Sequence, residues 1–87
     1  HILRNMELAA VLWNDRHADP SMHLFTNSAK AIAWAKAKAF SMDRHGDFRE
    51  VSLSDSMRRA GWIYCVIYSC ENDGLRVEMV TVDKDVA

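Results

Sequence analysis

Residues 62–70 have the sequence WIYCVIYSC, which is the most strand-like stretch of the chain. β-Branched and aromatic residues dominate it, and such residues favour the pleated, packed surface of a strand. Successive side chains of a strand point to opposite faces, and here both sets are mostly apolar. The pattern predicts an interior strand, because a strand with two apolar faces needs cover on both sides. In regular alternation Trp62, Tyr64 and Tyr68 share one face as an aromatic stripe.

The segment after this strand predicts a hairpin. Residues 72–74 are Asn-Asp-Gly, and such residues tolerate the positive φ of tight hairpin turns. With the Asp-Gly pair at the tip, residues 62–70 pair with a last strand over residues 75–82. The expected cross-strand pairs are Glu71 with Arg76, Tyr68 with Met79 and Ile67 with Val80. A wider loop would shift this register by one residue.

The N-terminal third predicts a second hairpin. Residues 6–13 (MELAAVLW) form an apolar strand, and residues 22–25 (MHLF) form a shorter one. Residues 14–21 between them are polar and include the only proline, which predicts a long loop at the hairpin tip.

A long helix follows over residues 29–42. It is rich in Ala and Lys and has no Gly or Pro. Residues 26–28 (Thr-Asn-Ser) are three candidate N-caps, and Gly46 is the expected terminator, with Arg44 and His45 in the last turn. Helical periodicity predicts that the side facing the core consists of Ile32, Ala35, Ala39 and Met42, flanked by Ala29, Ala33 and Phe40. The same periodicity places Trp34 away from that side.

The remaining segment predicts a strand over residues 48–53 and a short helix over residues 54–60 that Gly61 closes. The fold class is therefore α+β, in the order β-β-α-β-(short α)-β-β. We expect a single antiparallel sheet of about five strands with one long helix on one face.

The chain has 87 residues, which is enough for one domain, residues 1–87. Residues 1–5 are interpreted as a tag remnant or a disordered segment, and residues 83–87 as a fraying tail. The net charge is −1 without a basic stripe, so we expect no nucleic-acid partner. No apolar run is long enough for a membrane span. Cys65 and Cys70 lie too far apart on one strand to bridge, and free thiols indicate the cytoplasm.

The loop after the first strand carries the candidate polar site. Asp15-Arg16-His17-Ala18-Asp19 places acids, a base and an imidazole on one tip, and His23 follows on the returning strand. These groups suit ligand binding, and His17, His23 and Asp19 are the alternative metal ligands. Their spacing matches no defined metal motif, and polar residues also gather on loops because loops are solvated. No cofactor is expected.

The sheet has more apolar surface than one helix can cover. Two strands are apolar on both faces, and one long helix covers only one face of a sheet. Large exposed apolar patches mark interfaces, so we expect a homodimer through the second sheet face or through an edge strand.

No motif names a reaction. The leading hypothesis is a small non-enzymatic binding or regulatory module, dimeric, with a protein or small-molecule ligand. Its expected binding residues are the loop residues Asp15, Arg16, His17 and Asp19, together with His23, Trp62, Tyr64 and Tyr68. The alternative is a small metal-binding protein or acid–base enzyme that uses the loop with His23.

Overall fold

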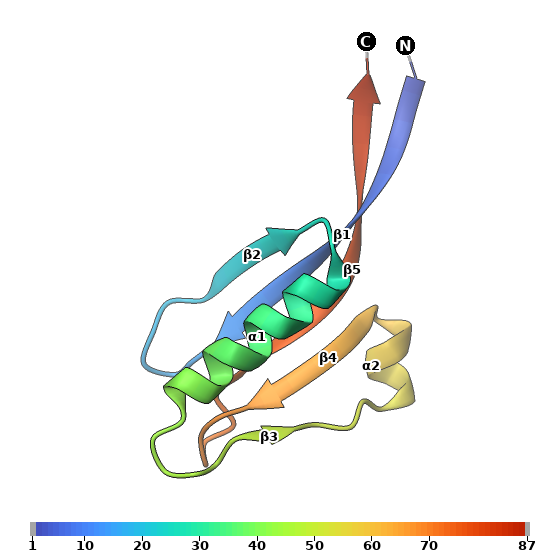
Figure 1. Cartoon of the computed structure of the whole chain (residues 1–87). Coiled ribbons are helices and arrows are strands. Elements are labelled where there is room, and N and C mark those ends of the chain that lie inside the picture. Colours follow the sequence, from blue (N-terminus) through green and yellow to red (C-terminus); the bar gives the residue numbers. More distant parts are fainter. Residues whose placement is uncertain (1, 87) are drawn as a thin grey trace.

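The computed structural model describes the backbone of residues 2–86 and the side chains of residues 6–83. It shows one antiparallel sheet of five strands in the order β2-β1-β5-β4-β3, with a long helix packed on it (Figure 1). The expected fold class is confirmed. The elements are β1 (Ile2–Asn14), β2 (Ser21–Phe25), α1 (Ser28–Met42), β3 (Arg49–Glu50), α2 (Asp55–Arg59), β4 (Trp62–Ile67) and β5 (Gly74–Val86).

The first and last strands lie side by side in the middle of the sheet. β1 and β5 pair along their whole length, from Ile2 opposite Val86 to Asn14 opposite Gly74. Residues 2–5 and 83–86, for which the sequence indicated no strand, pair with each other and extend the sheet as a two-stranded ribbon (Figure 1). The expectation that His1 is a tag remnant lies outside the described residues.

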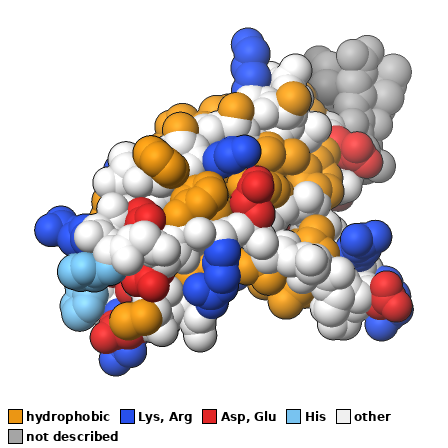
Figure 2. All heavy atoms as spheres, turned by 60° about the horizontal axis from the view of Figure 1, so that its bottom comes forward, with side chains coloured by type: hydrophobic (Ala, Val, Ile, Leu, Met, Phe, Trp, Pro, Cys, Tyr) orange, Lys and Arg blue, Asp and Glu red, His pale blue; other side chains and the backbone are white. Residues whose placement is uncertain are grey.

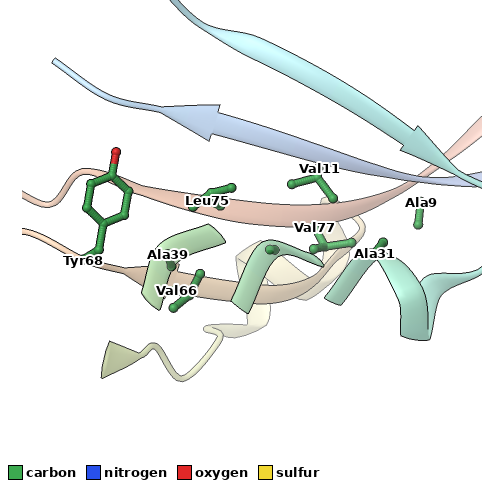
Figure 3. Close-up of a cluster of buried hydrophobic side chains, with 9 residues drawn as sticks. Ala9, Val11, Ala31, Ala39, Val66, Tyr68, Leu75 and Val77 are labelled. Atoms are coloured by element: carbon green, nitrogen blue, oxygen red, sulfur yellow. The ribbon is translucent and has the colours of Figure 1, made fainter. Parts of the chain in front are cut away.

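Small residues let α1 lie close to the sheet. Its buried positions are Ala31, Ala35 and Ala39, and they pack on buried side chains of β1, β4 and β5 (Figure 3). Asn27 is the N-cap, because its side chain accepts a hydrogen bond from the Lys30 backbone at 3.0 Å. The core cluster consists of Ala9, Val11, Ala31, Ala35, Ala39, Val66, Tyr68, Leu75 and Val77.

The helix face differs from the expectation in three respects. The residues expected to flank the core side, Ala29, Ala33 and Phe40, are exposed, whereas Ala31 is buried. Trp34 is not away from the core, since it packs beside Phe25 and His23 of β2, with ring centroids 6.0 and 4.6 Å away. The helix also ends before Arg44 and His45. Asp43 is its C-cap, with extended backbone angles, and its carboxylate accepts hydrogen bonds from the backbone nitrogens of residues 45, 47 and 48.

The last hairpin has a wider turn than the sequence predicts, so the expected register is wrong. Ile67 pairs with Gly74 and Cys65 with Arg76, and residues 68–73 form the loop. The Tyr68 backbone nitrogen donates to the Asp73 carbonyl at 2.9 Å, which closes the loop one step before Gly74. Asn72, with φ of 65°, adopts the left-handed conformation that the Asp-Gly pair was expected to supply.

A bulge separates the expected aromatic stripe. The register of β4 against β5 shifts between Trp62 and Tyr64, so Trp62 pairs with Glu78 while Tyr64 pairs with Val77. Tyr64 and Tyr68 therefore face α1, and Trp62 faces the opposite side. The strand expected over residues 48–53 is also shorter than predicted, covering only Arg49–Glu50.

The face of the sheet opposite α1 is called the open face from here on. Strand alternation and register place these residues on it: Met6, Leu8, Ala10, Leu12 and Asn14 of β1, Met22 and Leu24 of β2, Arg49 of β3, Trp62, Cys65 and Ile67 of β4, and Arg76, Glu78, Val80 and Val82 of β5. The expected second apolar face is present. Within the described part of the chain, no helix is long and apolar enough to cross a membrane.

Candidate functional site

The loop between β1 and β2 begins with a tight turn that Asp15 organises. The Asp15 side chain accepts a hydrogen bond from the backbone nitrogen of His17 at 2.7 Å. Its backbone carbonyl accepts another from Ala18 at 3.3 Å. An Asp side chain that bonds the backbone two residues ahead is a common way to start a turn. The loop therefore presents His17 and Arg16 outward, and both are exposed.

Tyr68 ties this loop to the core. Its hydroxyl accepts a hydrogen bond from Trp13 Nε1 at 2.8 Å and donates one to Asp15 Oδ2. Tyr68 is only 4% exposed and lies at the end of the core cluster, apart from its aliphatic members (Figure 3). The pairing joins residues more than fifty positions apart along the chain, so only the folded sheet can form it.

These hydrogen bonds set the charge of the site. The Tyr68 hydroxyl, followed by the His17 backbone nitrogen, lowers the pKa of Asp15 because both stabilise the carboxylate. Burial, together with the hydrogen bond to Asp15, raises the pKa of Tyr68 to about 12. At neutral pH the pair is therefore a carboxylate and a neutral phenol.

Asp73 makes a second link between the two loops. One carboxylate oxygen accepts from the Arg16 backbone nitrogen at 2.9 Å, and the other accepts from Ser69 Oγ at 2.9 Å. Asp73 is only 5% exposed, and these two bonds satisfy its buried carboxylate. The loop at 15–20 and the loop at 68–73 are thus held as one unit.

A pocket of about 440 Å³ lies where these loops meet the end of α1. Glu71 lies at its edge, where it forms an ion pair with Arg16 at 3.2 Å and lies 3.7 Å from the His17 imidazole. Histidine and acidic side chains gather at one end of the molecule (Figure 2). The lining residues are Asp15, His17, Met42, Arg44, His45, Asp47, Tyr68, Ser69, Cys70, Glu71 and Asp73.

The structure brings together some of the expected site residues and separates others. Asp15, His17 and Tyr68 line the pocket, and Arg16 pairs with Glu71 at its edge. Asp19 is exposed further along the loop.

The other expected binding residues lie elsewhere in the fold. His23 is on the side of β2 that faces α1 and contacts Trp34. The Tyr64 hydroxyl donates a hydrogen bond to Glu50 at 2.6 Å. Burial, and then that hydrogen bond, raises the pKa of Tyr64. Trp62 lies on the open face with Arg76 over its ring at 4.7 Å.

The metal alternative of His17, His23 and Asp19 does not form one cluster in the fold. Over the residues that the structure describes, no group of three or more His, Cys, Asp or Glu side chains is placed to hold a metal ion. His17 faces Glu71, while His23 contacts the helix.

Sequence reasoning missed the half of the pocket that comes from other segments. His45 and Asp47 follow α1, and Cys70, Glu71 and Asp73 belong to the second loop. Sequence patterns assigned roles to three of these residues, and none of the roles was a pocket. Asp73 indicated a turn, His45 the last turn of the helix and Glu71 a cross-strand pair with Arg76.

Chemically, the pocket offers carboxylates beside imidazoles and one guanidinium. A general base works best when its pKa lies near the operating pH, and Asp15 has the opposite shift. The arrangement therefore suits binding of a polar molecule better than proton transfer by Asp15. Comparisons of the chain with protein-family models, with curated proteins and with solved structures find no match.

Proposed function

We propose that this chain is a small non-enzymatic interaction module that works as a homodimer through the open face of its sheet. One observation carries the proposal. In the described part of the chain, five large apolar side chains are exposed, and four of them lie on the open face. They are Met6 at 39%, Met22 at 58%, Leu24 at 53% and Val82 at 44% exposure.

The physical reason is the composition of this face. Antiparallel sheets that expose one face to water usually carry polar residues on it, whereas this face is mostly aliphatic. Fully burying a Leu or Met side chain is worth about 1.5–3 kcal/mol, so a second copy that covers this face gains stability from several side chains at once. Pairing through the edge strand β2 is the competing route, and its five residues offer a short edge.

The test is the mass of the full chain in solution across micromolar concentrations, measured by light scattering after size exclusion. We expect a dimer for the wild type. Leu24→Lys places a charge in the proposed interface and should shift the chain toward a monomer. Phe40→Lys is the matched control, because Phe40 is 70% exposed but lies on α1, away from the open face. A monomeric wild type overturns the proposal, and so does a dimer that Phe40→Lys disrupts and Leu24→Lys leaves intact.

A second candidate function is the binding of a small polar molecule in the pocket between the two loops. The observation that favours it is the pocket of about 440 Å³ with the ionised Asp15 in its wall. Carboxylates of Asp47 and Glu71 also line it, so a ligand with a positively charged group fits its chemistry.

Native mass spectrometry of the purified chain tests this candidate. A retained small molecule that is lost in Asp15→Asn supports ligand binding. The runner-up metal site is tested on the same sample with added Zn²⁺, comparing the wild type with His17→Ala. Identical spectra for all three chains exclude both.

The compartment belongs to the same proposal. Cys65 and Cys70 are both free. Free thiols persist where the environment is reducing, and we therefore assign the module to the cytoplasm.

A further inference from the structure

The open face carries one pair of opposite charges in its middle. Arg76 and Glu78 of β5 lie two positions apart on the same strand, in the middle of this face. The face carries a third charged residue, Arg49, which is exposed on the edge strand β3 opposite Ile67. Arg76 Nε lies 2.8 Å from Glu78 Oε1, and the two side chains are 35% and 20% exposed.

Apolar residues flank both charges across the sheet. Register places Arg76 between Leu12 of β1 and Cys65 of β4, and Glu78 between Ala10 of β1 and Trp62 of β4. A partner that covers the apolar residues must also cover the charges. Removing a charged group from water is costly unless its surroundings supply an opposite charge. Arg76 and Glu78 supply this charge to each other, and a partner that places an acid beside Arg76 and a base beside Glu78 adds a second opposite charge to each.

A second copy of this chain offers that arrangement of charges in one orientation. We propose that two open faces pack about a two-fold axis that lies between the two sheets, runs perpendicular to the strands and passes over β5 at the level of Val77. In this arrangement Arg76 of each copy faces Glu78 of the other. This inference rests on the proposed homodimer and adds its geometry. The two sheets lie about 10 Å apart, as in other face-to-face sheet packings.

The same axis matches the apolar rows. The residues level with Arg76 across the sheet lie opposite the residues level with Glu78 of the second copy. On the outer strand β2, Met22 therefore meets Leu24. Leu12 meets Ala10, and Cys65 meets Trp62, by the same operation. An axis parallel to β5 instead places Arg76 against Arg76 and Glu78 against Glu78, and like charges in a desolvated interface weaken association.

A charge-swap experiment tests this geometry, with dimer dissociation measured by analytical ultracentrifugation. Arg76→Glu alone puts two acids opposite two acids, and Glu78→Arg alone puts two bases opposite two bases. We expect each variant to dimerise at least about tenfold more weakly than the wild type. An equimolar mixture of the two should form a heterodimer as tight as the wild-type dimer. The double swap Arg76→Glu with Glu78→Arg should also dimerise, because it keeps both the pair within the chain and the pair across the interface.

Controls separate this inference from the homodimer itself. Lys30→Glu makes the same charge change on exposed α1 and should leave dimerisation unchanged. Thermal melts of every variant report whether the monomer still folds. If a single variant does not fold, the double swap is used to test the orientation in its place. A monomeric wild type overturns both proposals. A wild-type dimer that Leu24→Lys disrupts, with Arg76→Glu dimerising as tightly as the wild type, overturns the orientation alone.

Discussion

Tyr68→Phe isolates the hydroxyl that joins the two loops at the end of the core. The substitution keeps the buried ring and removes one oxygen, which accepts from Trp13 and donates to Asp15. The ring packing with the core cluster is unchanged in this variant. Any loss of stability therefore reports the two hydrogen bonds.

The expected cost follows from the kind of bond that is lost. A hydrogen bond to an ionised group contributes about 1.5–3 kcal/mol, and the Asp15 carboxylate is ionised at neutral pH. The Trp13 indole nitrogen also loses its partner, in a half-buried position. We expect the free energy of unfolding to fall by about 2–3 kcal/mol, which for a domain of this size lowers the Tm by roughly 8–24 °C.

Chemical unfolding followed by tryptophan fluorescence measures this loss, at a fixed protein concentration because association adds to stability. Tyr64→Phe is the matched control. It removes a hydroxyl that donates to Glu50 at an exposed position, and exposed bonds to carboxylates contribute about 0–1 kcal/mol.

A double-mutant cycle with Asp15→Asn completes the measurement. If the Tyr68 hydroxyl acts through Asp15, the effects of the two substitutions are not additive, with a coupling of about 1 kcal/mol or more. Equal losses for Tyr68→Phe and Tyr64→Phe, or strictly additive effects in the cycle, would refute the reasoning.

The remaining predictions concern two glycines, the stability of the fold at low pH and the reactivity of the two thiols. Gly74→Ala should lower the free energy of unfolding by about 3 kcal/mol, because the added Cβ would collide with a backbone carbonyl oxygen of β4. Gly46 has φ of 77° and open space around it, so Gly46→Ala should lower it by only about 1–2 kcal/mol. Thermal melts of the two variants measure the difference. The pKa of Asp15 is lower in the fold than its ordinary 3.8, so the stability it contributes is complete above that value and disappears as the pH falls through the lowered pKa. Urea unfolding should therefore show the wild type losing its advantage over Asp15→Asn in acid, and a constant difference at every pH would contradict this. Cys70 is exposed, whereas Cys65 is half-buried and burial raises its pKa, so a thiol reagent should modify Cys70 first, as intact mass of the two single Cys→Ser variants will reveal.

Local sequence patterns were sufficient for the elements and for the class of fold. The alanine-rich segment formed a helix whose N-cap is Asn27, one of the three expected caps, because its side chain satisfies a free backbone nitrogen of the first turn. The short helix kept its Ser54 N-cap and its Gly61 terminator for similar local reasons. Alternation in the first strand also predicted a second apolar face, since side-chain direction repeats every two residues.

Register depended on contacts that no local pattern encodes. The last hairpin closed at Ile67 and Gly74 because the Asp73 side chain and carbonyl hold a six-residue loop, and this displaced the expected Asp-Gly turn. One bulged residue at Ile63 then moved Trp62 to the open face, away from Tyr64. A one-residue shift reverses every side chain beyond it, so periodicity alone could not place the aromatic residues.

The sequence by itself thus determined that this chain folds as an antiparallel sheet with one long helix and with more apolar surface than that helix covers. Only the tertiary structure decided that β1 and β5 share the centre of the sheet, which leaves Arg76 and Glu78 in the middle of the open face. It also decided that the loop at 15–20 meets the loop at 68–73 through Tyr68 and Asp73. The reason is physical, because helix caps and strand alternation act over a few residues, whereas strand order and buried polar bonds join residues more than fifty positions apart.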